Sequence, residues 1–297
     1  MVDLHIHTNA SSDAFTSPEE VVSIALSKGL SAIAITDHRT VKGIALAIRT
    51  GNKLGMEVIP GVEIHATYIK TTIHITGLFI DPTEPTLLDF LSKLDAKHVI
   101  KHAINNQLMV GLLAGMGFPL TIEQIAYLVD LNTGSRPFMI KYVEDMGMIH
   151  ANDEIKKQEI MDKLMNINYY RYKDLNLHAE EVISYIHKAG GLAVLAHPLE
   201  YNMEWDDIDT MLAHLKSCGL DGMEVYYYNY DETQRDKLLL LAKKYNFLLS
   251  GGSDFHGYEK QNGRDIGKGL YGSLVPDEAL EEMKASFNNG NTNKSAS

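Results

Sequence analysis

Short apolar and β-branched runs alternate along the chain with longer segments in which apolar residues recur at helical spacing. Side chains alternate between the two faces of a strand and recur about every 3.6 residues around a helix, so this pattern predicts alternating strands and helices. The expected strands are 2–6, 32–36, 57–62, 72–79, 192–196, 222–227 and 247–250. Seven such strands indicate an α/β protein with parallel pairing and a barrel-like sheet.

The first expected helix has readable boundaries at both ends. Ser17 is a favourable N-cap, Pro18 suits the first helical position, and Gly29 ends the segment. Further helices that alternate with the strands are expected at 43–54, 179–189, 208–217 and 232–245.

One long segment interrupts this alternation. Residues 86–176 are helical in pattern and contain no clear strand, so we expect a helical insert between strands four and five. The barrel would then consist of residues 1–85 and 177–287. The polar segment 288–297 is expected to be disordered.

Composition excludes several classes of protein. The formal net charge of −12 argues against charge-driven binding of long nucleic acid, because such binding requires lysine and arginine to neutralise phosphates. It remains compatible with a small phosphorylated substrate, since bound cations reverse the local charge. No apolar run approaches the roughly 18 residues that span a bilayer, so no membrane partner is expected.

The N-terminus and the cysteine content suggest a compartment. Residues 1–5 lack the basic and apolar regions of a secretory signal. The single cysteine, Cys218, lies at the end of an expected helix and is interpreted as structural rather than nucleophilic. One cysteine cannot form an internal disulfide, so we expect a reducing, cytoplasmic location.

Histidines and carboxylates stand near the ends of the expected strands. In α/β barrels the carboxyl ends of the strands converge on one face, where functional residues collect. The residues at these positions are His5, His7, His38, Glu63, His74, His197, Asp254 and His256. A cleft with so many titratable groups would carry a large desolvation cost unless cations held them. Imidazole with carboxylate suits Zn²⁺, Mn²⁺ or Fe²⁺, and the set exceeds what one ion needs, so we expect two or three divalent metal ions.

The remaining histidines are expected to have ordinary surface or core roles. His65 is expected to face away from the neighbours of His74, whereas the others lie in helical segments: His98, His102, His187 and His214. The pattern does not decide between these readings for His150 and His178.

The order of motifs resembles the PHP superfamily, the polymerase and histidinol phosphatase domain. The resemblance is carried by Asp3-Leu-His-Ile-His-Thr8, Thr36-Asp-His38, Gly61-Val-Glu63, His74, Ala196-His-Pro198 and Gly252-Ser-Asp-Phe-His-Gly257. It implies a distorted (β/α)7 barrel. The helical insert and Ala10-Ser-Ser-Asp13 are most similar to the bacterial small-nucleotide phosphoesterases, which include nucleoside 3′,5′-bisphosphate phosphatases and a 5′-to-3′ exoribonuclease.

The resemblance also implies how the ligands are distributed. One metal would take His5, His7, Glu63 and Asp254; a second would share Glu63 and take His74 and His197; a third would take Asp13, His38 and His256. Asp37 would orient neighbouring groups from behind the ligands. The implied reaction is attack on phosphorus by a metal-bound hydroxide, without a protein nucleophile.

The insert departs from the subfamily pattern. The subfamily usually has Gly-Arg-Pro-His where this chain has Ser135-Arg-Pro-Phe138, and arginines where it has Lys97-His-Val-Ile-Lys-His102. Arg136 remains available to bind a second phosphate. Arg171 and His178 are further candidates for substrate binding.

The leading hypothesis is a phosphatase or phosphodiesterase for small nucleotides, with nucleoside mono- and bisphosphates or short oligonucleotide ends as substrates. A histidinol-phosphate phosphatase is a second hypothesis, against which the insert and Asp13 speak. A non-catalytic, metal-stabilised binding module is a third, and the complete set of ligand types argues against it.

Overall fold

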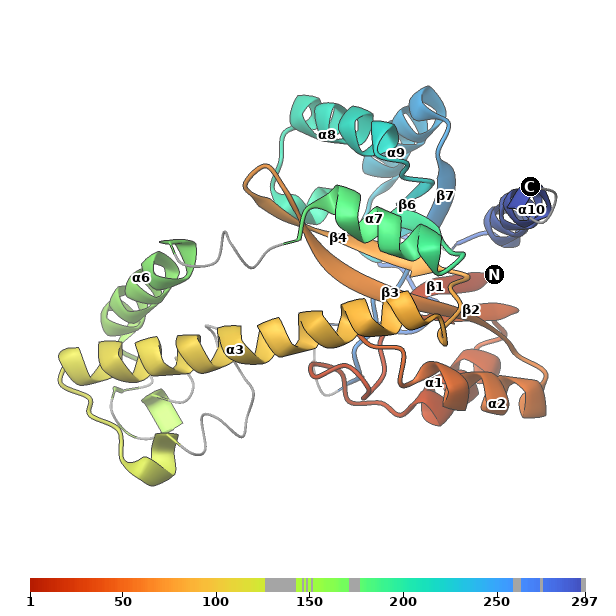
Figure 1. The fold of residues 1–297 in the computed structure, drawn as a ribbon. Coiled ribbons are helices and arrows are strands. Elements are labelled where there is room, and N and C mark those ends of the chain that lie inside the picture. Colours follow the sequence, from red (N-terminus) through yellow and green to blue (C-terminus); the bar gives the residue numbers. More distant parts are fainter. Residues whose placement is uncertain are drawn as a thin grey trace. The chain divides into compact units, whose positions relative to one another are not determined.

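The computed structural model describes residues 1–125, 143–145, 147, 149–150, 152–170, 177–258, 263–272 and 275–294. The chain divides into two compact units. Residues 1–91 and 177–297 form the first unit, and residues 92–176 form the second. The second unit is therefore inserted into the sequence of the first, which contains the seven strands of the described sheet (Figure 1).

The sheet of the first unit runs in sequence order from β1 to β7. Its strands are β1 (Val2–Ile6), β2 (Ala32–Ile35), β3 (Glu57–Tyr68), β4 (Thr71–Leu78), β5 (Leu192–Leu195), β6 (Gly222–Tyr227) and β7 (Leu248–Gly252). Backbone N–H groups of Asp254 and His7 donate to the carbonyls of His5 and Phe255, each at 2.9 Å. These bonds join the end of β7 to β1, so the expected seven-stranded α/β barrel is confirmed.

The direction of β4 differs from the expected parallel pairing. β1, β2 and β3 are mutually parallel, as are β5, β6 and β7, but β4 is antiparallel to both β3 and β5. Only Ile69 and Lys70 connect β3 to β4, which is far too short for the crossover that a parallel strand needs. The reversal makes His65 and His74 direct partners across the two strands.

The helices of the first unit are α1 (Pro18–Ser27), α2 (Ile44–Leu54), α7 (Ala179–Lys188), α8 (Trp205–Ser217), α9 (Glu232–Tyr245) and α10 (Asp277–Lys294). All but α10 lie close to the expected bounds, and α10 has no expected counterpart. At the start of α1 the Glu20 N–H donates to Ser17 Oγ at 3.3 Å, and the Ser17 N–H donates to Glu20 Oε2 at 3.0 Å. This reciprocal capping explains why the helix begins where the sequence predicts.

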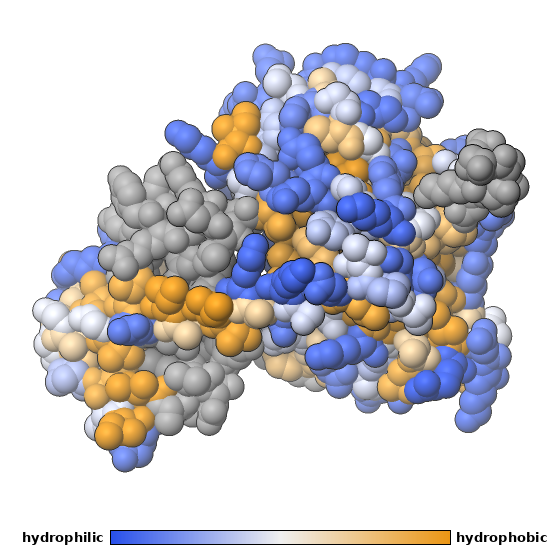
Figure 2. All heavy atoms as spheres, in the orientation of Figure 1, coloured by the Kyte–Doolittle hydropathy of each residue, from blue (hydrophilic) through white to orange (hydrophobic). Residues whose placement is uncertain are grey.

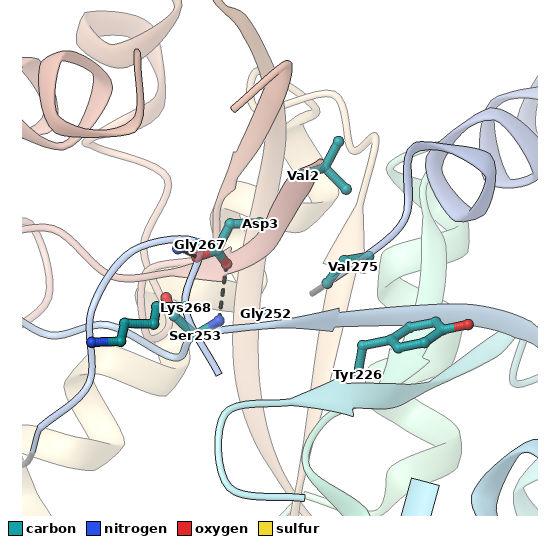
Figure 3. A pocket seen from close by; sticks show the side chains of 8 residues that line it. All are labelled: Val2, Asp3, Tyr226, Gly252, Ser253, Gly267, Lys268 and Val275. Carbon is teal, nitrogen blue, oxygen red and sulfur yellow. Dashed lines mark hydrogen bonds between the residues drawn. The ribbon is translucent and has the colours of Figure 1, made fainter. Parts of the chain in front are cut away.

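A buried carboxylate, Asp3, connects β1 to the chain that follows β7. Its Oδ1 accepts hydrogen bonds from the backbone N–H groups of His5 (3.3 Å) and Ser253 (3.0 Å), and its Oδ2 accepts one from Gly267 (2.8 Å). Figure 3 shows Asp3 between Ser253 and Gly267. Burial raises the pKa of Asp3, and these hydrogen bonds oppose the rise by stabilising the charged form.

The second unit contains the larger part of α3 (Pro85–Gly115) and α6 (Glu154–Tyr170). Its small core includes Leu113, Val143, Ile149 and Ile160. Figure 2 shows apolar surface along α3, and the exposed apolar side chains of that helix include Val99, Ile100 and Ile104. Even so, none of the helices in the described part of the chain has the length and hydropathy to cross a bilayer.

The end of the chain differs from the sequence-based expectation. α10 continues to Lys294, so the helix includes most of segment 288–297, for which the sequence predicts disorder. Ala279, Leu280 and Met283 of this helix are buried in the barrel core, which stabilises it. Each further residue then adds one hydrogen bond at little cost, even where the sequence is polar.

Replacement of Gly252 by alanine should destabilise the barrel. A Cβ at this position would lie 2.5 Å from the backbone nitrogen of His5 and 2.6 Å from Asp3 Oδ1. Since β1 must then move away from β7, we expect Gly252→Ala to lower the free energy of unfolding by about 1–3 kcal/mol, as overpacked cores do. Urea denaturation followed by circular dichroism measures this change.

Gly290→Ala is the matched control for this substitution. No described atom lies within 4 Å of a Cβ at this helical position. Alanine should therefore leave stability unchanged or raise it by up to about 1 kcal/mol. Equal unfolding midpoints for the two variants would contradict the close packing of β7 on β1.

Candidate metal centre

Six imidazoles and two carboxylates meet at one end of the barrel, which we call the edge of the barrel below. β1 carries His5 and leads into His7, His38 follows β2, Glu63 is on β3, His74 is near the start of β4, His197 follows β5, and Asp254 and His256 follow β7. β4 enters this edge at its start rather than its end, because it runs opposite to β3. The sheet topology thus brings together all eight residues at the expected strand ends.

Glu63 lies at the centre of this group. Its Oε1 is 2.9 Å from His74 Nδ1 and 3.1 Å from His197 Nε2. Its Oε2 is 3.0 Å from His38 Nδ1 and 3.3 Å from His7 Nε2. Oε1 is also 3.4 Å from His5 Nε2. The two carboxylate oxygens therefore face different imidazoles, and such a carboxylate can contact more than one ion.

Asp254 joins the part of the cluster formed by β1. Its Oδ1 is 3.2 Å from His7 Nε2 and 3.5 Å from His5 Nε2. The ligand atoms of His5, His7 and Asp254 lie within 4.8 Å of one another, and the same holds for Glu63, His74 and His197. Each set offers three donor atoms around one point.

A third set of donors involves the loop after β1. Asp13 Oδ2 is 3.3 Å from His256 Nε2 and 3.7 Å from His38 Nε2. The nitrogen atoms of His7, His38 and His256 also lie within 4.8 Å of one another. Asp13, which the sequence suggests only through the family resemblance, therefore meets the same two histidines as expected.

A layer of hydrogen bonds holds the outer sides of these groups. Asp37 Oδ1 accepts from the Thr8 N–H at 2.6 Å, and Asp37 Oδ2 accepts from Thr8 Oγ1 at 2.8 Å. His256 Nδ1 is 2.9 Å from the carbonyl oxygen of Asp254, which leaves its Nε2 toward Asp13. Such bonds fix the orientation of an imidazole and the nitrogen it presents.

Glu224 is a part of the site that the sequence analysis misses. It lies fully buried on β6, with Oε1 2.7 Å from His5 Nδ1 and Oε2 accepting from the His197 N–H at 2.7 Å. One carboxylate therefore orients two members of the cluster. The available signal was a lone carboxylate inside an otherwise apolar strand, a position that is costly unless the group has partners.

His65 is the second residue that belongs at this edge. Its ring centroid is 4.1 Å from that of His74 and 5.0 Å from that of His38, and its Nδ1 is 3.1 Å from Arg39 Nη1. The expectation that His65 faces away from this region is wrong, because β3 continues to Tyr68 instead of ending at Val62. In a continued strand, Glu63 and His65 are two residues apart and share a face.

Burial and neighbouring charges shift the pKa values of the cluster residues in different directions. Burial lowers the pKa of His7 to about 3 and that of His38 to about 4. Burial also opposes charge on His5, but the carboxylates of Glu224 and Glu63 raise its pKa to about 10. Burial likewise disfavours the charged form of Glu63, yet the surrounding imidazoles hold its pKa well below the ordinary value. An ionised carboxylate and neutral imidazoles are the forms that bind metal.

The donor geometry fits divalent ions. Among the described residues, the buried Glu63 Oε2 and His197 Nδ1 have no hydrogen-bond partner of suitable geometry. Buried polar atoms of this kind are rare and call for a ligand or an ion. A mixed set of imidazole nitrogens and carboxylate oxygens is suited to divalent metal ions.

Of the three expected substrate-binding residues, the structure describes only His178. Arg136 and Arg171 lie outside the described residues, as does Phe138. His178 is the N-cap of α7, where its backbone N–H donates to Glu181 Oε2 at 3.3 Å. Among the described residues, Arg39 brings a positive charge next to these histidines, because its guanidinium contacts His65 on β3.

Several known proteins align with this chain over most of its length and most of their own. A 5′-3′ exoribonuclease from Haemophilus influenzae is 32% identical, and the match covers 86% of this chain and 89% of the relative. A 3′,5′-nucleoside bisphosphate phosphatase from Chromobacterium violaceum is 28% identical, with 90% of each chain covered. A solved structure from Bifidobacterium adolescentis, assigned to the metal-dependent phosphoesterases, has a TM-score of 0.69 at 25% identity and covers 95% of this chain and 94% of its own.

The family model of the PHP domain matches residues 3–218. This segment includes the strand ends that carry His5, Glu63 and His197, while Asp254 and His256 follow it in the sequence. This match covers well over half of the chain, and the fold and the cluster of histidines at the strand ends agree with it. The chain belongs to the PHP domain family.

Proposed function

We propose that this protein is a metal-dependent phosphoesterase that hydrolyses small phosphorylated nucleotides, such as nucleoside monophosphates and 3′,5′-bisphosphates. The observation that carries the proposal is the position of Glu63, whose two oxygens face two sets of imidazoles. A carboxylate shared by two ions is characteristic of sites that cleave phosphate esters with clustered metals.

Three ions account for the full set of donors. The first would be held by His5, His7, Glu63 and Asp254, and the second by Glu63, His74 and His197. The third would be held by Asp13, His38 and His256. The mixture of imidazole and carboxylate favours manganese, iron or zinc.

The chain's own contribution to the chemistry is to orient these donors. When bound, the ions supply an activated water and positive charge for the phosphoryl oxygens. Glu224 holds His5 Nδ1 and thereby keeps His5 Nε2 toward the cluster. Asp37 holds Thr8 between the two strand ends that carry His7 and His38. Direct attack by water on phosphorus requires no serine or cysteine nucleophile.

Similar proteins and the net charge support the proposed substrate class. The bisphosphate phosphatase from Chromobacterium violaceum aligns over nearly the whole chain, so the same chemistry on a small nucleotide is available here. A net charge of −12 gives no general attraction for a long polyanion. Arg39 adds a guanidinium next to His65, a group suited to a phosphate oxygen.

Glu63→Gln tests the metal cluster. The amide keeps the volume but removes the charge, so we expect kcat to fall by at least roughly 100-fold and the Mn²⁺ content per chain to drop. Activity is measured as phosphate release from a nucleoside 3′,5′-bisphosphate in Mn²⁺ buffer, and metal content by elemental analysis.

Glu57→Gln on the same strand is the matched control. Glu57 is exposed and pairs with Lys284 at 2.8 Å, away from the histidines in the strand register. The Glu57→Gln variant should retain wild-type metal content and activity. Near wild-type turnover by fully metallated Glu63→Gln protein would refute the bridging role.

Substrate length separates the proposal from its strongest competitor. The relative from Haemophilus influenzae is a 5′-3′ exoribonuclease, so degradation of RNA ends is the second candidate function. We expect a nucleoside 3′,5′-bisphosphate to be hydrolysed faster than a long single-stranded RNA at equal concentrations of ends.

Both rates should be measured in the same Mn²⁺ buffer at two salt concentrations. Charge-driven binding of a long strand weakens steeply with salt, whereas a small nucleotide is much less affected. Faster turnover of the long RNA at both salt concentrations would replace the small-nucleotide proposal with the exoribonuclease.

A further inference from the structure

The two oxygens of Asp254 have different surroundings. Oδ1 faces the cluster, 3.2 Å from His7 Nε2 and 3.4 Å from His256 Nδ1. Oδ2 faces away from it and accepts a hydrogen bond from the Tyr227 hydroxyl at 2.8 Å and a second from Arg264 Nη1. One oxygen is therefore presented to the cluster while the other is anchored.

Arg264 also holds the backbone of the same residue. Its Nη1 lies 3.1 Å from the carbonyl oxygen of Asp254, so one nitrogen contacts both the main chain and the side chain. Asp254 has a φ of 50°, in the left-handed region that is unfavourable for residues other than glycine. Such a conformation persists only where neighbouring groups determine it, and the guanidinium is one of these groups.

The segment that carries Arg264 is itself fixed to the barrel. The Gly267 N–H donates to Asp3 Oδ2 at 2.8 Å, and the Leu270 N–H donates to the Tyr228 carbonyl at 2.7 Å (Figure 3 shows Asp3 and Gly267). The guanidinium carbon of Arg264 lies 5.4 Å from the ring centroid of Tyr227 and 5.8 Å from that of Tyr228. These aromatic contacts restrict the arginine before any ligand arrives.

We propose that Arg264 is a positioning residue for the metal cluster: it fixes Asp254 so that Oδ1 points at the ions. This inference rests on the metal cluster of the proposed function, since it assigns a role behind one of its ligands. Arg264 acts through Asp254 and is not itself a ligand. Its effect is on how tightly the first ion is held.

Charge repulsion alone predicts the opposite change in metal affinity when Arg264 is removed, which makes the inference testable. A cation beside a ligand repels the metal, so removal of Arg264 would tighten binding if charge repulsion dominated. If orientation dominates, removal frees Asp254 to rotate and weakens binding. Loss of an outer partner of a ligand costs about 10–100-fold in metal affinity.

The test is Mn²⁺ titration of the metal-stripped full-length protein by calorimetry, with metal content after gel filtration as a second readout. Arg264→Met keeps an unbranched side chain but removes the charge and the donors, and we expect affinity about 10–100-fold below wild type. Arg264→Lys keeps the charge and one donor group, so it should restore part of the loss.

Lys268→Met is the matched control, because it removes a cation from the same segment and Lys268 is exposed. It should bind Mn²⁺ as wild type does. Circular dichroism verifies folding, and if Arg264→Met does not fold, Arg264→Lys decides the question by binding more weakly than Lys268→Met. Equal or tighter binding by the Arg264 variants overturns the positioning role. Absence of Mn²⁺ binding by the wild type would instead refute the proposed function.

Discussion

The carboxylate of Glu63 is the group on which the arrangement of the site depends. It is buried, and its oxygens lie within 3.4 Å of imidazole nitrogens from His5, His7, His38, His74 and His197. An ionised carboxylate at such a depth is stable only with compensating charge around it. The barrel provides this compensation by directing strand ends from both halves of the sheet to one point. Divalent ions between these groups would complete it.

The sheet topology makes this convergence possible. β3 is long enough to pass beyond its parallel partner β2 and to continue as one arm of a hairpin with β4. The hairpin returns His74 to the edge where Glu63 and His65 lie. Without the reversal of β4, a histidine at the start of that strand would lie at the opposite end of the barrel. The antiparallel direction of β4 therefore brings His74 into the cluster.

Behind the atoms that face the cluster lies a layer of buried carboxylates, each with hydrogen-bond partners. Glu224 orients His5 and the backbone of His197, Asp37 holds Thr8, and Asp3 connects β1 to the segments that follow β7. In an interior of low dielectric, each of these bonds is strong, and each unpaired group would be costly. This layer of hydrogen bonds holds the imidazoles and carboxylates of the cluster in fixed orientations close to one another.

The sequence by itself determined the alternation of strands and helices, the place of the insert and the identity of most cluster residues. These follow from local rules: hydrophobic period, capping by Ser17, and the placement of polar residues where apolar runs end. Asp13 required the family resemblance, because it lies in a loop and no periodicity marks it.

Tertiary structure decided which strands pair and which side chains meet. The extension of β3 into a hairpin with β4 determines the face of His65, and the residues around the turn at Ile69 and Lys70 fit either a strand or a turn, so their pattern does not reveal the hairpin. Glu224 and Arg264 are more than 200 residues from His5, yet one contacts it directly and the other holds its neighbour Asp254. Local pattern carries no information about such contacts, because they arise only when the barrel closes and brings β1, β6 and β7 together.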